Sequence, residues 1–326
     1  MPLRFLVLLP LLAACNAAAT TPAEAPLTVN IDRDRVTVSG ISSGAYMAGQ
    51  LHVAHSSLIG GAGLIAGGPY ACAGGSIEKA LGLCTKGGDF DLESIAEHVS
   101  RLFESGAIDD PLNLADDRVW LFHGAADAIV DASVTAAAAD FYRGYAPPES
   151  IALLETVAAA HGMPTLAAGA PCGEMVSPFI NACGFDAAGA LLEHLYGPLE
   201  EPAASTGELR TLDQQKFADV EMWDRALLYV PEDCAKGASC GLHVVFHGCR
   251  QSAEFVGDAF VKNAGYNEWA ETNRLVVLYP QAASSKVAPV NPHGCWDWWG
   301  YTGEQYATKD GAQIVAARSL IDALMQ

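Results

Sequence analysis

The stretch Val36-Thr-Val-Ser-Gly-Ile-Ser-Ser-Gly-Ala45 runs from a short apolar strand into the pattern G-x-S-x-G, and helix-compatible residues 45–55 follow it. A serine on a sharp strand-to-helix turn crowds its neighbours, so the positions two before and two after it must be nearly free of side chain. Within this stretch, Ser42 has glycine at both offsets, Gly40 and Gly44. We therefore predict that Ser42 is a nucleophile, with an ordinary tight turn as the alternative.

Length and composition favour one α/β domain over residues 27–326. The chain has 326 residues and 51% hydrophobic content, which is enough for one large core. No linker-like run and no internal repeat divides it. A net charge of −20, with only 18 Lys and Arg, argues against nucleic acid and against electrostatic docking on anionic lipid.

Residues 1–26 have the composition of an export signal followed by a flexible tether. Arg4 precedes an apolar run that is too short to span a bilayer. Leu12-Ala-Ala-Cys15 resembles a lipoprotein box, in which Cys15 carries the lipid, whereas Ala17-Ala-Ala19 is an A-x-A site for ordinary secretion. A chance cysteine in an Ala-rich signal is the third option. We expect an extracytoplasmic protein, either secreted or held at the cell envelope by this lipid anchor alone.

Cysteine usage agrees with export. Eight of the nine cysteines lie beyond Cys15, and an even set in an exported chain suggests disulfides. The first six are close neighbours in sequence, which favours local pairs and leaves the last two to each other. A metal site is the alternative, but no C-x-x-C occurs, so we expect no metal. We also expect no cofactor, because acyl transfer through a serine nucleophile requires none. The expected disulfides are Cys72–Cys84, Cys172–Cys183, Cys234–Cys240 and Cys249–Cys295.

A serine nucleophile needs a base and an acid that orients the base. For the acid, residues 118–122 form a strand-like run that ends in His123-Gly124, and Asp127 follows in the loop. An α/β-hydrolase sheet delivers its acid in this way, at the carboxyl edge of the strands. Asp131 is a nearby rival, and a loop aspartate is often only a turn or cap residue.

For the base, a histidine on a loop later in the chain is expected. His161 lies among glycine and proline, whereas His194 lies in a helix-like run over 187–196 and is the weaker candidate. The resulting order, Ser42 then Asp127 then His161, is the order of the α/β hydrolases.

One part of the machinery is missing from the first half of the chain. An oxyanion hole needs the N–H after the nucleophile, here that of Ser43, and a second N–H from a loop that normally precedes the serine. Near the C-terminus, a buried-type strand over 242–246 ends in His247-Gly248, and a helix-like stretch over 252–273 and an apolar strand over 274–281 follow. These are the elements with which the sequence of an α/β-hydrolase normally begins, yet here they follow the elements with which it normally ends. We therefore predict a circularly permuted α/β-hydrolase fold with a mostly parallel, doubly wound sheet.

Six motifs then carry a resemblance to a known family. They are Gly-Ile-Ser-Ser-Gly-Ala-Tyr-Met-Ala (40–48), Phe-His-Gly-x-x-Asp (122–127), His-Gly-Met-Pro-Thr (161–165), Pro-Phe-Ile-Asn-Ala-Cys-Gly-Phe-Asp-Ala-Ala-Gly (178–189), Phe-His-Gly-Cys (246–249) and Gly-Cys-Trp-Asp-Trp-Trp-Gly-Tyr (294–301). Together they resemble the poly(3-hydroxybutyrate) (PHB) depolymerase family, in its permuted, single-domain type with an early lipase box. The likeness covers nearly everything from residue 36 onward.

This resemblance implies an exported serine esterase that cleaves PHB, or related short-side-chain polyhydroxyalkanoates and their oligomers, through an acyl-serine intermediate. It implies Ser42, Asp127 and His161 as the catalytic triad, and the backbone N–H groups of Ser43 and Cys249 as the oxyanion hole. The expected partner is a polyester or oligoester substrate, and we expect a monomer. Two other functions stay open: an exported carboxylesterase for feruloyl, acetyl or other small esters, and a non-catalytic surface lipoprotein.

Substrate contacts are expected from a dense aromatic cluster near the C-terminus. A neutral aliphatic polyester offers little beyond apolar surface and carbonyls, which aromatic rings contact at low entropy cost. A packed aromatic core is the alternative, and we expect at least one ring to face the substrate. The candidates are Trp296, Trp298, Trp299 and Tyr301.

Overall fold

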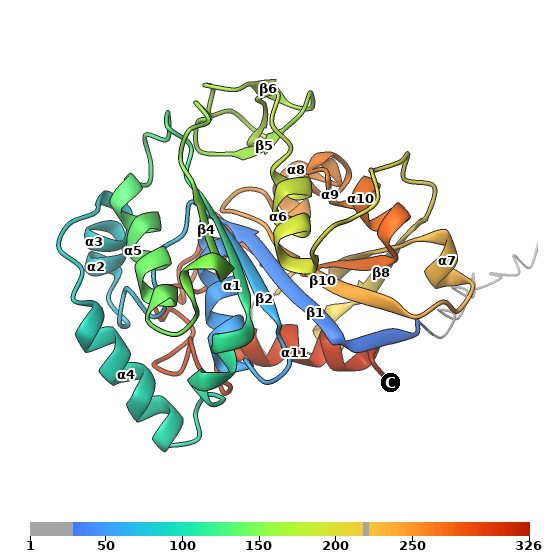
Figure 1. Ribbon diagram of the computed structural model, residues 1–326. Helices are drawn as coiled ribbons and strands as arrows, with labels where there is room; N and C mark the ends of the chain where they lie inside the picture. The colour runs from blue at the N-terminus through green and yellow to red at the C-terminus, as the bar shows by residue number, and fades with distance from the viewer. Residues whose placement is uncertain (1–28, 218–221) are drawn as a thin grey trace, which may run out of the picture.

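The computed structural model describes residues 29–217 and 222–326, and an eight-stranded sheet runs through its centre (Figure 1). The strand order is β4-β3-β2-β1-β10-β11-β9-β8, and every pairing from β4 to β11 is parallel, whereas β9 and β8 are antiparallel additions at one edge. The strands are β1 (Ile31–Ile41), β2 (Gly61–Ile65), β3 (Arg118–Phe122), β4 (Ile151–Leu154), β8 (Glu208–Asp213), β9 (Arg225–Val230), β10 (Cys240–Phe246) and β11 (Leu275–Tyr279).

The position of β1 establishes the connectivity. It is the first strand of the chain, yet it lies inside the sheet between β2 and β10, and β10 comes from the C-terminal third. If the strands are counted from β8 onward and then from β1, their order in the sheet is that of an α/β-hydrolase. Here β1, the strand that leads into Ser42, comes first in sequence instead, which is a circular permutation. The predicted circularly permuted α/β-hydrolase fold is therefore confirmed.

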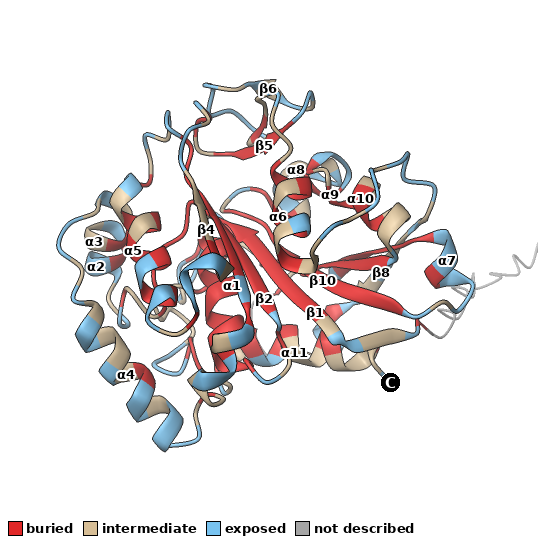
Figure 2. Cartoon of the chain, viewed as in Figure 1, coloured by how far each residue is buried: buried red, intermediate tan, exposed pale blue. Residues whose placement is uncertain are grey.

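Helices cover both faces of the sheet, which explains why its strands read as continuous apolar runs. Figure 2 shows the central strands buried along most of their length, and all seven residues of β10 are buried. One core contains side chains of α1 (Ser43–Ala54), α4 (Leu92–Glu104), α5 (Ala132–Arg143) and α11 (Ala312–Leu324). The other contains side chains of α6 (Ala187–Tyr196), α9 (Ala259–Asn263) and α10 (Tyr266–Asn273).

Smaller elements surround this frame. A three-stranded sheet, ordered β5-β7-β6, lies at the top of the view in Figure 1. Its strands are β5 (Met163–Thr165), β6 (Ala170–Pro171) and β7 (Ile180–Ala182). The short helices are α2 (Ile77–Leu81), α3 (Leu83–Lys86), α7 (Glu232–Ala235), α8 (Ala253–Val256) and the 3-10 turns η1 (Pro111–Asp116), η2 (Pro148–Ser150) and η3 (Gln214–Phe217).

One expected element is wrong. A single helix over 252–273 does not form, because Gly257 and Gly265 have φ angles of 56° and 92° and break the segment into α8, α9 and α10. Such left-handed backbone is available to glycine but ends an α-helix. The export signal and tether expected over 1–26, including Cys15, lie outside the described residues.

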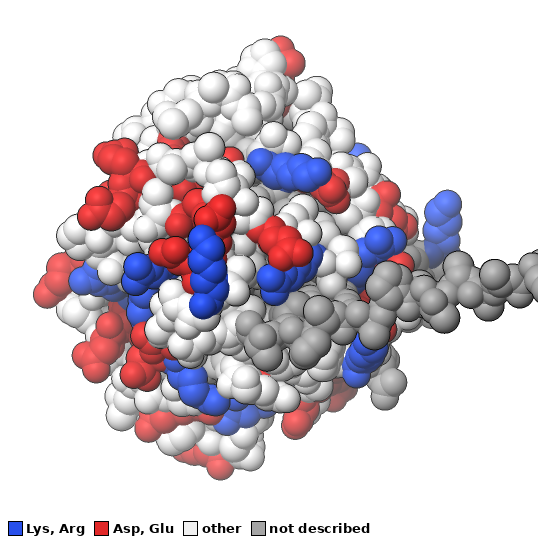
Figure 3. All heavy atoms as spheres, turned by 90° about the vertical axis from the view of Figure 1, so that its right-hand side faces the viewer, with Lys and Arg blue, Asp and Glu red and all other residues white. Residues whose placement is uncertain are grey.

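The surface and the cysteines agree with the expected environment. The structure contains the four expected disulfides, Cys72–Cys84, Cys172–Cys183, Cys234–Cys240 and Cys249–Cys295, which fit an extracytoplasmic location. On the face drawn in Figure 3, basic and acidic side chains are interspersed. Within the ranges that the structure describes, no helix is both long and apolar enough to cross a membrane.

Candidate active site

Ser42 lies on a strained turn between β1 and α1. Its φ of 58° and ψ of −123° are unusual for a residue with a side chain, and its N–H donates to Ile65 O on β2 at 2.8 Å. The flanking glycines are required by close backbone contacts. A Cβ on Gly40 would lie 2.2 Å from Gly44 O, and a Cβ on Gly44 would lie 2.2 Å from Phe246 O at the end of β10. The turn thus presses α1 directly against the neighbouring strand.

Asp127 and His161 form a hydrogen-bonded pair. His161 Nδ1–H donates to Asp127 Oδ2 at 2.7 Å, and Asp127 Oδ1 accepts from the N–H groups of Ile129 and Val130 at 2.8 and 3.0 Å. The Asp127 side chain is 1% exposed. Burial alone would raise the pKa of this carboxyl, but the hydrogen bonds from His161 and the two backbone N–H groups outweigh it and lower the pKa below 3.8. The carboxylate therefore holds the proton on Nδ1 and leaves Nε2 as the acceptor nitrogen.

The rival residues serve other purposes. Asp131 is the N-cap of α5, where its side chain accepts from the N–H of Ser133 at 2.9 Å. His194 lies near the C-terminal end of α6, and its Nε2 donates to Ser150 O at 2.9 Å. Neither residue lines the pocket that contains Ser42, whereas His161 does.

The loop after β10 lies beside Ser42, where a Cβ on Gly248 would be 3.5 Å from Ser42 Cβ. Three backbone N–H groups of this loop donate hydrogen bonds to acceptors within the protein. Gly248 N–H donates to Gln251 Oε1 at 2.8 Å, Arg250 N–H to a loop carbonyl at 2.8 Å, and Gln251 N–H back to Gly248 O at 3.1 Å. These contacts leave the N–H of Cys249 as the one that this turn can offer to a substrate oxygen.

His247 fixes the orientation of that N–H. Its Nδ1–H donates to Gly248 O at 2.7 Å, and its Nε2 accepts from the N–H of Ala282 at 3.1 Å. Gly248 O and the Cys249 N–H belong to one planar trans peptide, so holding the oxygen also holds the N–H, which points the opposite way. Burial lowers the pKa of His247 to about 4, and the ring therefore stays neutral with its proton on Nδ1.

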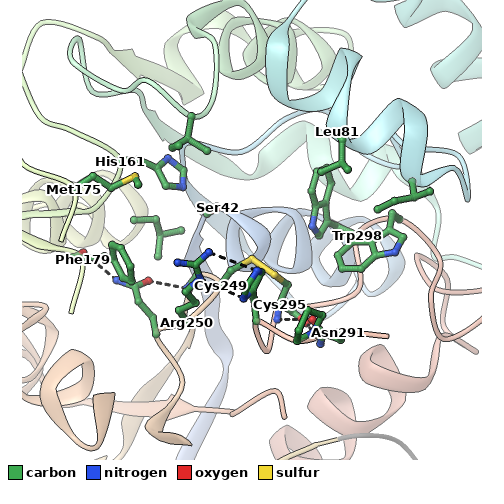
Figure 4. Close-up of a pocket in the computed structure, with 18 of the residues that line it drawn as sticks. Ser42, Leu81, His161, Met175, Phe179, Cys249, Arg250, Asn291, Cys295 and Trp298 are labelled. Carbon is green, nitrogen blue, oxygen red and sulfur yellow. Dashed lines mark hydrogen bonds between the residues drawn. A yellow bond between two sulfur atoms is a disulfide. The ribbon is translucent and has the colours of Figure 1, made fainter. Parts of the chain in front are cut away.

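Ser42, His161 and the Cys249 turn open into one cavity of about 480 Å³ (Figure 4). Its walls are largely apolar, as is usual for a pocket that binds small organic molecules. The apolar side chains come from several elements that are distant in sequence: Ile41, Ile77, Leu81, Ile129, Met175, Phe179, Val290, Trp298 and Trp299.

Three of the four disulfides close loops that carry these walls. The Cys72–Cys84 bridge encloses α2 with Ile77 and Leu81, and the Cys172–Cys183 bridge encloses the loop with Met175 and Phe179. The Cys249–Cys295 bridge joins the turn after β10 to the aromatic segment. The walls are thus covalently fastened where the chain has little regular structure.

The aromatic cluster divides into two groups. Trp298 and Trp299 line the pocket, and Trp298 stacks on Tyr46 with ring centroids 4.6 Å apart. The expectation for Trp296 is wrong, since its side chain is fully buried and packs edge-on against a ring of β10 at 4.9 Å. Tyr301 also lies away from the pocket lining, because its hydroxyl donates to Cys295 O at 2.9 Å.

Sequence reasoning missed several lining residues and one orienting residue. Gln251 binds Gly248 N–H and also donates to Phe179 O at 2.9 Å, which joins the turn to the small sheet. Nothing in the local sequence distinguishes this glutamine. A usable signal existed for Ile77, Leu81 and Met175, which are apolar residues inside short cysteine-bracketed loops.

The fold and pocket are those of an α/β-hydrolase with a serine-hydrolase type of site. No family model matches the chain. It is 38% identical over 315 residues to the poly(3-hydroxybutyrate) depolymerase of Delftia acidovorans, covering 94% of this chain and 62% of that protein. It is 34% identical over 315 residues to the polyhydroxybutyrate depolymerase of Talaromyces funiculosus, covering 92% of each.

Solved structures agree. The crystal structure of the PHB depolymerase from Penicillium funiculosum superposes with a TM-score of 0.87 and 32% identity, covering 93% of this chain and 99% of that one. A serine-to-alanine PHB depolymerase complexed with R3HB trimer matches equally well. The chain belongs to the PHB depolymerase family. It spans less than two thirds of the length of the Delftia relative.

Proposed function

We propose that the protein is an exported serine esterase that hydrolyses poly(3-hydroxybutyrate), or related short-side-chain polyhydroxyalkanoates and their oligomers. The observation that carries the proposal is the convergence of Ser42, the Asp127–His161 pair and the Cys249 turn on one apolar cavity. Family membership supports the substrate class, because relatives are named as depolymerases and one solved structure is a complex with R3HB trimer.

In the first half of the proposed reaction, His161 Nε2 takes the Ser42 hydroxyl proton as Oγ bonds to the carbonyl carbon of an ester. Asp127 keeps the imidazole in the required tautomer and stabilises its charged form. The tetrahedral oxyanion accepts hydrogen bonds from the N–H groups of Ser43 and Cys249, and the N-terminus of α1 also favours this charge. Each such donor contributes a factor of roughly 10²–10³ in comparable enzymes.

Collapse of this intermediate breaks the ester C–O bond, and His161 returns its proton to the leaving alcohol. Water then attacks the hydroxyacyl-Ser42 ester, with His161 taking a proton from the water and giving it back to Ser42. This second half yields a free carboxylic acid and the regenerated enzyme. The two halves together consume one water for each ester bond broken, with no change of oxidation state.

The pocket suits this substrate class. Methyl and methylene groups of a polyester chain fit walls formed by Trp298, Trp299, Met175 and Phe179. We propose residues 27–326 as one catalytic unit that acts as a monomer. Residues 1–26 are the export signal and tether, with either a lipid on Cys15 or secretion into the medium.

The test is release of 3-hydroxybutyrate products from amorphous PHB by the mature, oxidised chain beside Ser42→Ala. A p-nitrophenyl ester serves as the reference substrate. Products that depend on Ser42 support the proposal. Turnover of the small ester without polymer or oligomer products would reassign the protein to small-ester hydrolysis, and inactivity on both would contradict a catalytic function.

A further inference from the structure

The pocket holds a single permanent charge. Among its described lining residues there is no aspartate, glutamate or lysine, and Arg250 is the only arginine. The surrounding protein carries a net charge of −20. A neutral polyester repeat offers this cation no partner. A lone cation in an apolar pocket of an acidic protein therefore indicates that the pocket binds a negatively charged group.

Arg250 is held in place without being neutralised. Its backbone has a φ of 61°, which places a non-glycine residue in the left-handed region, and its N–H donates to His293 O at 2.8 Å. Its Nε donates to His293 Nδ1 at 3.3 Å. Partial burial, reinforced by the Arg250 charge, lowers the pKa of His293, so this partner is neutral at pH 7. Across the described ranges, no carboxylate forms a salt bridge with Arg250.

The side chain is exposed and starts from the turn that offers the Cys249 N–H. Figure 4 shows Arg250 in the pocket beside Cys249 and below Ser42. A ligand carboxylate bound to this guanidinium is therefore separated by only a short length of the ligand from an ester carbonyl bound at the Cys249 N–H. A guanidinium is matched to a carboxylate because its parallel N–H groups meet both oxygens.

An aliphatic polyester has one anion, the free carboxylate at one end of each chain. The acyl group that Ser42 receives comes from the hydroxyl-terminal side of the broken ester, so the fragment with the carboxylate is the leaving alcohol. We propose that Arg250 binds the terminal carboxylate of a hydroxyacid oligoester on the leaving-group side of the pocket. This gives the enzyme a preference for free-acid chain ends over esterified ends. The inference rests on the proposed function and assigns it a substrate class.

The experiment compares the (R)-3-hydroxybutyrate trimer with its methyl ester, which differ in this one charge. Their Kd values are measured by calorimetry on Ser42→Ala, with and without Arg250→Gln, so that hydrolysis does not interfere. The control, Arg101→Gln, removes an equal charge from the exposed face of α4. We expect Arg250→Gln to weaken acid binding relative to ester binding by about tenfold, the lower range for a charge-assisted hydrogen bond. Arg250→Lys should retain part of the preference.

The control variant should keep the ratio of the two Kd values, and added salt should reduce the ratio only where Arg250 is present. An acid-to-ester ratio that does not change in Arg250→Gln, while both trimers still bind, overturns the role of Arg250 and leaves the esterase proposal standing. If neither trimer binds to folded Ser42→Ala protein, the oligoester function itself is contradicted.

Discussion

Gly44→Ala tests whether the close contact between α1 and β10 sets the geometry of the site. A Cβ at this position would lie 2.2 Å from Phe246 O and 2.4 Å from His247 O, whereas such contacts are essentially never below 3.0 Å. Both neighbours are backbone atoms, so the helix or the turn must shift by roughly 1 Å, and a displacement of that size at reacting groups costs about 10² in rate. Overpacking also costs about 1–3 kcal/mol of stability.

Gly49→Ala in the same helix is the matched control. Its Cβ would meet Tyr142 Oη at 3.7 Å, which is an ordinary contact, and alanine gains about 0.5–1 kcal/mol over glycine inside a helix. We expect its Tm to rise by about 2 °C, with kcat unchanged. Both variants are assayed by p-nitrophenyl butyrate hydrolysis and thermal unfolding. The reasoning is refuted if Gly44→Ala keeps kcat within about threefold of wild type, or if Gly49→Ala loses as much as Gly44→Ala.

Three further predictions follow from the site and its supports. Asp127→Asn should lower kcat by about 10²–10⁴ with little change in KM, because an amide does not hold the His161 proton on Nδ1; an unchanged kcat in steady-state assays would contradict the role of Asp127. Replacing both cysteines of Cys172–Cys183 by serine should raise KM for the trimer, because the loop that this disulfide closes forms part of the pocket wall. The same change at Cys234–Cys240 should cost about 2 kcal/mol of stability and leave KM unchanged. Equal KM values for the two variants would contradict the role of the Cys172–Cys183 disulfide in holding the pocket wall. Lowering the pH should destabilise the fold, because burial lowers the pKa of three histidines from 6.5. Below that pH the unfolded chain binds protons at these residues that the native chain does not bind. The free energy of unfolding is therefore at its full value above about pH 6.5 and falls toward pH 4, with a slope of up to about 4 kcal/mol per pH unit near pH 5. Urea midpoints that do not differ between pH 7 and pH 5 would contradict this assignment; the pKa is about 4 for His55, about 3 for His243 and about 4 for His247.

The sequence predicts the frame of the fold because its signals are local. Residues 36–45 have the strand and glycine spacing of a nucleophile turn, and this requirement is visible in the Gly40 and Gly44 contacts. The placement of a His-Gly strand end late in the chain is enough to predict the permutation. Cysteine proximity likewise gives the four disulfides.

What the sequence does not predict depends on tertiary contacts. Trp296 and Trp298 are two positions apart on one loop, yet one ring is buried against β10 and the other faces the pocket. No local pattern distinguishes them, since both are large aromatic residues. The role of Gln251 is equally unpredictable from the sequence, because this side chain joins Gly248 to a loop about seventy residues earlier in the chain. The break in the helix at Gly257 and Gly265 could have been anticipated from those glycines.

The most direct test of the account is to identify the residue that carries the acyl group during turnover. The protein is mixed with (R)-3-hydroxybutyrate trimer, quenched in acid within milliseconds, and mapped by peptide mass spectrometry. We predict a hydroxybutyryl ester on Ser42 that is absent from Ser42→Ala, which should also release no acid products. Acylation of another residue, or continued hydrolysis of the trimer by Ser42→Ala, would contradict the central role of Ser42.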